Sequence, residues 1–240
     1  MLIRTGLPRP GGAAALKGVS DYVTATDLAS EAAIVPVLRR LTPDIPILAE
    51  EGGGERSELM WAVDPLDGTT NFTRGLPMVG VSVGLLDGLE PVVGVVIAPF
   101  LGLEFAGAWG GGATLNGVRL GALRDLAPGQ AVVATGFPFR NKERFPRYRQ
   151  VLLGALGTLE DLRRPGAASL DLAWTAAGTF DGFFEVNLGT WDVAAGACLV
   201  REVGGVVSDW EGGQNWSRSG DIIAAAPRVH AQLLEFAKPG

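Results

Sequence analysis

The sequence is poor in the residues on which several classes of site depend. Its 240 residues include one cysteine, Cys198, and one histidine, His230. A single cysteine permits no internal disulfide, which agrees with a cytoplasmic protein. Because zinc sites are built largely from cysteine and histidine ligands, the shortage of both argues against zinc. We expect Cys198 to pack within an apolar helix and His230 to be exposed on a C-terminal helix.

Long apolar runs and clustered positive charge are also missing. No apolar run reaches the length that spans a membrane, and the basic segment MLIRTGLPRPGG contains no apolar core of signal-peptide length. The formal net charge is −6, and the 20 basic residues are scattered along the chain. Nucleic-acid-binding proteins gather such residues into a stripe. We therefore expect a cytoplasmic protein whose partner is neither a membrane nor a nucleic acid.

What the sequence does contain is enough apolar material for a large core. Hydrophobic residues make up 47% of the chain, and its 35 glycines follow no three-residue period. The glycines exclude collagen and imply many tight turns. No repeat or low-complexity linker divides the chain. We expect an α/β protein of one unit with two lobes, an N-terminal lobe over about residues 1–125 and a C-terminal lobe over about 126–240.

The first lobe reads mainly as antiparallel sheet. Residues 17–41 predict a turn and then a helix that either Thr26 or Asp27 caps. The pairs Asp87-Gly88 and Asn116-Gly117 each separate two β-rich runs, which predicts two hairpins. Two further short apolar runs, IPILAEE and LMWAVDPL, predict strands that end in acidic residues.

The second lobe alternates helices and strands. The pattern predicts strands at 131–138, 181–187, 205–209 and 221–226, and helices at 143–156, 167–178, 192–205 and from about 227 through Phe236. Such alternation is typical of a mixed α/β lobe.

The segment WAVDPLDGTTNF, residues 61–72, places two acids where a buried strand runs into a turn. Pro65 fixes φ, so we expect the strand to break and both Asp64 and Asp67 to face one point. Gly68 permits close approach of the backbone to a ligand, and the following TTNF predicts a short helix whose free N–H groups attract an anion. Two like charges about 4 Å apart cost roughly 4 kcal/mol at an effective dielectric constant of 20. A divalent cation, Mg²⁺, Mn²⁺ or Ca²⁺, would remove that conflict.

Taken alone, the pattern formed by Asp64, Asp67 and Gly68 has other interpretations. Asp-x-x-Asp-Gly also occurs as a plain turn closed by an aspartate side chain. An EF-hand loop requires alternating acids and a closing glutamate, and the phosphatases of the haloacid dehalogenase type use Asp-x-Asp, which is one residue shorter. The spacing argues against both of these.

The sequence around Asp64 and Asp67 says more about the function. WAVDPLDGTTNFTRGLP, the preceding ILAEE and the later WDVAAGACLVREVGG resemble the inositol monophosphatase family in order and spacing. DYVTATD, ATGFPFR and GAASLDLAWTAAGTFDGFFE extend the resemblance over nearly the whole chain. The resemblance implies a layered αβαβα sandwich, two or three Mg²⁺ ions, inhibition by Li⁺ and a homodimer. It also implies hydrolysis of a small phosphate monoester, inositol monophosphate, by a metal-activated water.

The resemblance further assigns the metal ligands. Glu50, Asp64 and the backbone carbonyl of Leu66 would bind the first ion, and Asp64, Asp67 and Asp192 would bind the second. Such a two-metal site can activate water at one ion and stabilise the leaving oxygen at the other. From the sequence alone, Asp192 could instead be only the N-cap of the helix that follows.

The remaining assignments concern catalysis and substrate. The resemblance makes Glu50, Thr69 and Asp67 catalytic, with Glu50 and the Thr69 hydroxyl deprotonating the attacking water. The N–H groups of Gly68 and Thr69 would seat the phosphate.

The ring of the substrate would lie against Gly166 and Ala168, and Glu185 would accept its hydroxyl hydrogen bonds. Glu185 could also be an ordinary surface glutamate of a strand, and Ala167 lacks the hydroxyl usual in the family at its position. Arg163 and Arg164 leave open a fructose-bisphosphatase or broader sugar-phosphate phosphatase, because arginine can bind a second phosphate. A binding relative without turnover is the alternative from another class.

Overall fold

The computed structural model describes residues 15–18 and 21–238, so the segment MLIRTGLPRPGG lies outside the described residues. A seven-stranded sheet runs, in spatial order, through β3 (Ile47–Ala49), β4 (Leu59–Asp67), β5 (Gly80–Asp87), β6 (Glu90–Ala98), β7 (Leu103–Ala108), β8 (Gly112–Leu115) and β9 (Val118–Arg119). Only the β3–β4 pair in it is parallel. The predicted antiparallel sheet and both hairpins are therefore confirmed.

A five-stranded mixed sheet follows in the chain. Its spatial order is β11 (Asp161–Arg163), β10 (Val132–Thr135), β12 (Gly182–Glu185), β14 (Ile222–Ala225) and β13 (Val206–Ser208). The pairs on either side of β10 are parallel, and the pairs on either side of β14 are antiparallel. A separate pair of short strands, β1 (Ala15–Gly18) and β2 (Asp21–Val23), was not predicted. The turn expected between them includes residues 19–20, which lie outside the described residues.

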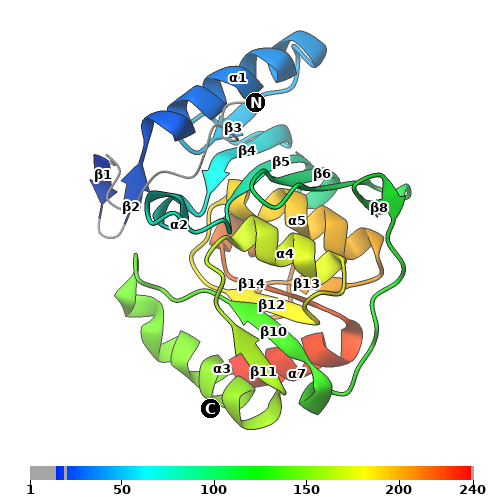
Figure 1. Cartoon of the computed structure of the whole chain (residues 1–240). Coiled ribbons are helices and arrows are strands. Elements are labelled where there is room, and N and C mark those ends of the chain that lie inside the picture. Colours follow the sequence, from blue (N-terminus) through cyan, green and yellow to red (C-terminus); the bar gives the residue numbers. More distant parts are fainter. Residues whose placement is uncertain (1–14, 19–20, 239–240) are drawn as a thin grey trace.

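Helices fill the spaces between and outside the sheets. They are α1 (Ala25–Leu41), α2 (Thr69–Thr73), α3 (Phe145–Thr158), α4 (Ala168–Ala176), α5 (Thr190–Glu202), α6 (Trp216–Ser219) and α7 (Pro227–Ala237), with 3₁₀ turns η2 (Pro128–Gln130) and η3 (Lys142–Arg144). Figure 1 shows α1 outside the larger sheet, α4 and α5 between the sheets, and α3 and α7 outside the smaller sheet. This order confirms the predicted αβαβα layering.

The larger cluster of buried apolar side chains lies in the central layer, and a second cluster lies between the smaller sheet and helices α3 and α7. Residues 193–200 of α5 are all buried, and α5 packs against both sheets. Close approach to the larger sheet depends on glycine: a Cβ on Gly94 would lie 2.3 Å from the carbonyl oxygen of Ala195. The sheets use residues 47–119 and 132–225, while the division into lobes near residue 125 stays a prediction.

Three local expectations are wrong. Helix α1 is capped by Thr24, whose side chain accepts a hydrogen bond from the Thr26 N–H, and Asp27 is the N3 residue of the same capping box. Pro65 does not end its strand, because β4 continues to Asp67.

His230 is the third case, because it is buried at 6% exposure, with Nε2 2.8 Å from the Ser208 hydroxyl. Burial lowers the pKa of this imidazole.

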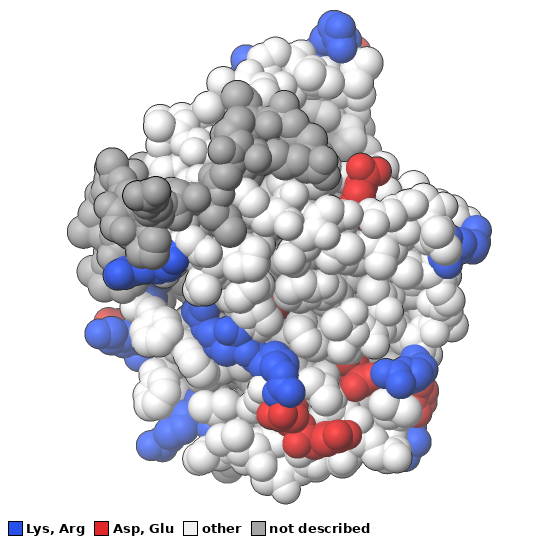
Figure 2. Space-filling view, viewed as in Figure 1, with Lys and Arg blue, Asp and Glu red and all other residues white. Residues whose placement is uncertain are grey.

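Cys198 is buried as expected, and burial raises the pKa of its thiol to about 12. A thiol with so high a pKa is a packing group rather than a nucleophile. Among the described residues, no helix combines the length and apolar character needed to cross a bilayer. On the face drawn in Figure 2, basic side chains occupy several separate places, some of them beside acids.

Candidate active site

An irregularity in β4 brings Asp64 and Asp67 together. Asp64 pairs with Ser82 and Asp67 pairs with Gly80, so one strand has an extra residue between these two pairs. Residues three apart on a regular strand point to opposite faces, and an inserted residue corrects this. Ser30 of α1 stabilises the irregular backbone by donating to the Pro65 carbonyl at 2.9 Å.

The hydrogen bond of a plain aspartate turn, the alternative interpretation of this pattern, is also present. The Asp64 carboxylate accepts the N–H of Leu66 at 2.9 Å, which is the side-chain hydrogen bond of an aspartate turn. This bond uses one lone pair and leaves the rest of the carboxylate available. Local turn formation and a role in a site therefore occur together here.

Two other elements deliver the remaining acids. The N–H of Glu50 donates to the Val63 carbonyl at 3.0 Å, which carries the parallel β3–β4 pairing one residue further and sets Glu50 beside Asp64. Asp192 lies in the first turn of α5. It is the N3 residue rather than the N-cap, and its carboxylate accepts the N–H of the Gly189 cap at 2.6 Å.

Ligand oxygens of Asp64, Asp67 and Asp192 lie within 4.8 Å of one another, which makes this cluster able to hold a metal ion. Burial raises the pKa of Asp64 well above its ordinary value, and the charges of Glu50, Asp67 and Asp192 add to the shift. Burial and the Asp67 charge raise the pKa of Asp192 to about 6. Burial also raises the pKa of Asp67, although the hydrogen bonds from Ser169 oppose it.

These shifts measure how strongly the cluster resists carrying its full negative charge. Carboxylates and a backbone carbonyl are hard oxygen donors, which suit Mg²⁺, Mn²⁺ and Ca²⁺. A divalent cation would lower the energy of the ionised form of all of these groups together. The residues present therefore fit the kind of metal that the sequence predicts.

The cluster opens into a cavity of about 550 Å³. All ten site residues predicted from the sequence line it: Glu50, Asp64, Leu66, Asp67, Gly68, Thr69, Gly166, Ala168, Glu185 and Asp192. These residues come from five separate parts of the chain, and the fold gathers them at one place. Their individual roles stay predictions.

Beside the acids lies the short helix α2. Gly68 is its N-cap and has a left-handed conformation with φ of 87°, and Thr69 is its first residue. The Thr69 hydroxyl lies 3.2 Å from the Leu66 carbonyl and 3.2 Å from a carboxylate oxygen of Asp27. The Thr69 hydroxyl therefore has a buried carboxylate to which it can pass a proton.

Glu185 lies at another part of the cavity wall, at the end of β12. Burial raises the pKa of Glu185 to about 8, while the Arg164 charge opposes the shift. A Cβ on Gly136 would lie 2.0 Å from this carboxyl group, so the glycine of the ATGFP segment leaves the space that Glu185 occupies. Glu185 is half-buried in the cavity and is not an ordinary surface glutamate.

Of the two arginines that could bind a second phosphate, only Arg164 lies at the cavity. Arg164 lines the cavity and its guanidinium carbon stacks 5.7 Å from the ring centre of Phe137. Arg163 is exposed, pairs with Asp161 and does not line the cavity. Arg140 is a second cavity arginine, which the sequence interpretation did not single out.

Three further polar residues were missed. Asp27 contacts Thr69, Ser169 donates both its N–H and its hydroxyl to Asp67 at 2.7 and 2.6 Å, and Asn71 donates to the Pro165 carbonyl at 2.9 Å. The Thr-x-x-Asp capping pattern at residues 24–27 was a signal that Asp27 has a fixed position. Ser169 sits two residues after Ala167 and supplies a hydroxyl to the same turn.

The Inositol monophosphatase family matches residues 3–238. The Nus factor SuhB of Pasteurella multocida is 43% identical over 229 residues, which cover 93% of this chain and 85% of that protein.

Two solved structures show the same fold. The extragenic suppressor protein suhB of Bartonella henselae has a TM-score of 0.88 at 38% identity, with 95% of this chain and 89% of that chain covered. The inositol monophosphatase of Anabaena has a TM-score of 0.83 at 36% identity, with 89% and 86% covered. From the match over nearly its whole length and from these relatives, the chain belongs to the inositol monophosphatase family.

Proposed function

We propose that the chain is a magnesium-dependent phosphatase that hydrolyses inositol monophosphate to inositol and phosphate. The observation that carries the proposal is the convergence of all ten predicted residues on one cavity, in which the neighbouring carboxylates raise the pKa of Asp64. Family membership supplies independent support. The reaction is the hydrolysis of a phosphate monoester by water.

The acids would hold the metal. Asp64, Asp67 and Asp192 would be its carboxylate ligands, with Glu50 and the Leu66 carbonyl completing the set. Bound Mg²⁺ would lower the pKa of a water molecule and offset the charge that develops on the phosphoryl and leaving oxygens. The inhibition by Li⁺ that the family implies belongs to the same proposal.

The chain's own groups would position the reactants. Glu50 and the Thr69 hydroxyl would orient the attacking water. As the water gives its proton to the Thr69 hydroxyl oxygen, Thr69 would pass its own proton to Asp27 Oδ1, which lies 3.2 Å away. The N–H groups of Gly68 and Thr69 would bind the phosphate. Arg140 and Arg164 would draw the anion into the cavity, because each already lowers the pKa of Glu185 through its charge.

Selectivity would come from Glu185, Gly166 and Ala168, which line the same cavity. A carboxylate can accept hydrogen bonds from two neighbouring ring hydroxyls. This arrangement favours a polyol phosphate over a simple aryl phosphate.

A phosphate-release panel with Mg²⁺ tests the proposal. The panel contains inositol monophosphate, fructose bisphosphate, phosphoadenosine phosphate and an aryl phosphate. We expect inositol monophosphate to have the highest kcat/KM and excess chelator to abolish release. A higher kcat/KM for fructose bisphosphate would favour a sugar bisphosphatase, and the specific observation behind that second candidate is Arg164 on the cavity wall.

The name Nus factor, borne by a relative at 43% identity, is the observation behind a non-catalytic binding role. Release from none of the substrates would favour that role over the enzyme. The retained acids and Thr69 favour the enzyme.

A further inference from the structure

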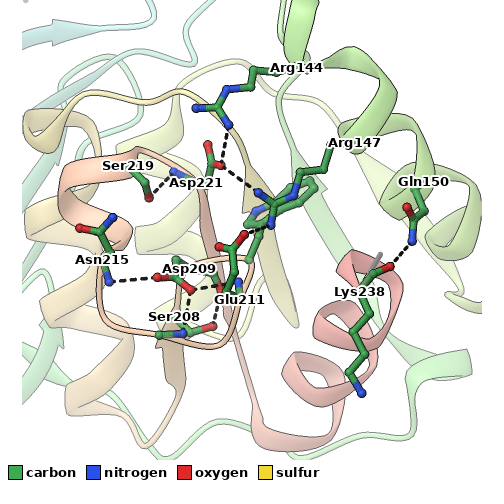
Figure 3. Close-up of polar contacts among 12 residues, drawn as sticks. Arg144, Arg147, Gln150, Ser208, Asp209, Glu211, Asn215, Ser219, Asp221 and Lys238 are labelled. Atoms are coloured by element: carbon green, nitrogen blue, oxygen red, sulfur yellow. Dashed lines mark hydrogen bonds and ion pairs between the residues drawn. The ribbon is translucent and has the colours of Figure 1, made fainter. Parts of the chain in front are cut away.

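Asp221 is a buried carboxylate outside the cavity lining. It lies immediately before β14. Its residue exposure is 3%. One carboxylate oxygen lies 3.3 Å from Arg144 Nη1 and 3.6 Å from Arg147 Nη1. Figure 3 shows both arginines reaching down to Asp221 from η3 and α3. The other oxygen accepts the backbone N–H of Asn187 at 3.1 Å.

The Asn187 contact leads directly to the cavity. The β12–β14 ladder ends where Glu185 pairs with Ile222. Asn187, two residues after Glu185, donates its backbone N–H to the Asp221 side chain instead of to a strand carbonyl. Asn187 has a left-handed conformation with φ of 63°, which asparagine adopts more readily than other non-glycine residues do. Val186, Asn187 and Leu188 all line the cavity.

The arginine contacts lead to the segment that lines another part of the same cavity. Residues 137–141 all line it, and Arg144 follows three residues later. Arg147 is fixed from two other sides, because it pairs with Glu211 at 2.6 Å and its guanidinium carbon lies 5.4 Å from the ring centre of Trp210. Asn141 closes the connection by donating to the Asn187 side chain at 3.4 Å.

We propose that Asp221 is a positioning residue: its carboxylate ties segment 137–141 to segment 186–188, and this tie sets the affinity of the cavity for the part of the substrate beyond the phosphate. The affinity half of the proposal rests on the proposed phosphatase function, and the structural half does not. Asp221 touches none of the predicted metal-binding or phosphate-binding residues in the contacts described, so kcat stays near the wild-type value when the tie is lost. The effect falls on KM.

The first test is kinetic and compares Asp221→Ala with Asp221→Asn. Loss of a buried charge-assisted contact predicts a KM for inositol monophosphate about tenfold higher in Asp221→Ala, with kcat within about threefold. Asn can keep an oxygen for the Asn187 N–H only by turning its NH2 group toward the two arginines, so Asp221→Asn recovers only part of the affinity. An aryl phosphate, which lacks ring hydroxyls, shows a KM within about threefold of wild type in both variants.

The second test is amide hydrogen exchange of the full-length protein, which needs no turnover. Asp221→Ala speeds exchange in both 137–141 and 186–188, and Asp221→Asn does so less. Asp209→Asn is the matched control, because Asp209 is also buried in the region drawn in Figure 3 but accepts its hydrogen bonds from Glu211, Gly213 and Asn215. It leaves both segments unchanged.

The outcomes separate the two proposals. An unchanged KM for inositol monophosphate in Asp221→Ala, or an equal rise for both substrates, overturns the affinity half. Exchange that stays unchanged in either segment, or rises equally in Asp209→Asn, overturns the structural half. If wild type hydrolyses neither substrate, the proposed function fails while exchange alone decides whether Asp221 ties the two segments.

Discussion

Two regions of the molecule bury acidic side chains and compensate their charge in opposite ways. Asp209 and Asp221 have exposures of 6% and 3%, and Asp64 and Asp192 have 1% and 8%. Asp209 accepts three backbone N–H groups, and Asp221 faces two arginines and one backbone N–H. The fold itself compensates these charges.

In the cavity, by contrast, Asp64 and Asp192 face other carboxylates. The charges of Glu50, Asp67 and Asp192 raise the pKa of Asp64, and the Asp67 charge raises the pKa of Asp192. Backbone donors reach them singly, from Leu66 and Gly189. Burial of an acid therefore does not identify a site by itself. What identifies it is a group of buried acids whose compensation has to come from outside the chain.

The largest expected effect comes from Asp64→Asn. Asp64 is central to the acidic cluster, and loss of metal-based stabilisation worth several kcal/mol predicts a fall in kcat/KM of about a thousandfold. Asp192→Asn should lose less. Steady-state phosphate release per folded molecule measures the loss in both variants, and Asp209→Asn, which changes a buried acid outside the cavity, is the control. Near-wild-type turnover in Asp64→Asn would falsify the assignment of this acid to the metal.

The second prediction concerns stability against pH in chelator. Asp192 and Glu185 have folded-state pKa values of about 6 and about 8, above the ordinary range of carboxyl groups. Their contribution to stability is therefore fully present below about pH 4 and is lost as pH rises through 6 to 8. Calorimetry in chelator should show a smaller loss between pH 5 and 8 for Asp192→Asn than for wild type.

Added Mg²⁺ should reverse that loss. At a hundredfold excess over its Kd, a ligand specific for the folded state stabilises by about 2.7 kcal/mol. The rise in Tm should therefore be larger at pH 8 than at pH 5, because more of the acids are ionised. Equal rises at the two pH values, or none, would contradict the link between the raised pKa values and the metal.

A smaller effect is expected at Glu185. Charge-assisted hydrogen bonds to two ring hydroxyls are worth about 1.5 to 3 kcal/mol. Glu185→Ala should then lower kcat/KM for inositol monophosphate about ten- to a hundredfold, and leave an aryl phosphate within a few-fold. Equal losses for the two substrates would indicate a role in holding the metal instead.

The smallest effect should come from His230, which does not line the cavity. Burial lowers the pKa of its imidazole, so the unfolded chain takes up a proton that the folded chain does not. Stability should fall as pH drops below about 6.5. His230→Gln should remove this part of the pH dependence in calorimetry while phosphate release stays unchanged. A steeper dependence in the variant would contradict it.

The sequence predicted what depends on local pattern and family spacing. The layer order, both hairpins and the convergence of Glu50, Asp64, Asp67 and Asp192 on one cavity agree with it. What it missed depends on contacts between distant segments: Ser169 meets Asp67 from 102 positions away, and Asp27 meets Thr69 from 42.

The wrong expectations have the same origin. Pro65 was expected to end a strand, but sheet pairing on both sides of it absorbed the irregularity as an extra residue. His230 was expected to be exposed because the local pattern could not show that Ser208 lies against it. The homodimer, the cytoplasmic location and the extent of the two lobes stay predictions.

The measurement that tests the comparison most directly is calorimetric titration of Mg²⁺ into chelator-treated wild type, Asp64→Asn and Asp209→Asn at pH 8. The account predicts saturable binding to wild type, binding at least about tenfold weaker in Asp64→Asn, and unchanged binding in Asp209→Asn, because only the cavity acids depend on a cation. Equal Mg²⁺ affinity in wild type and Asp64→Asn would contradict it.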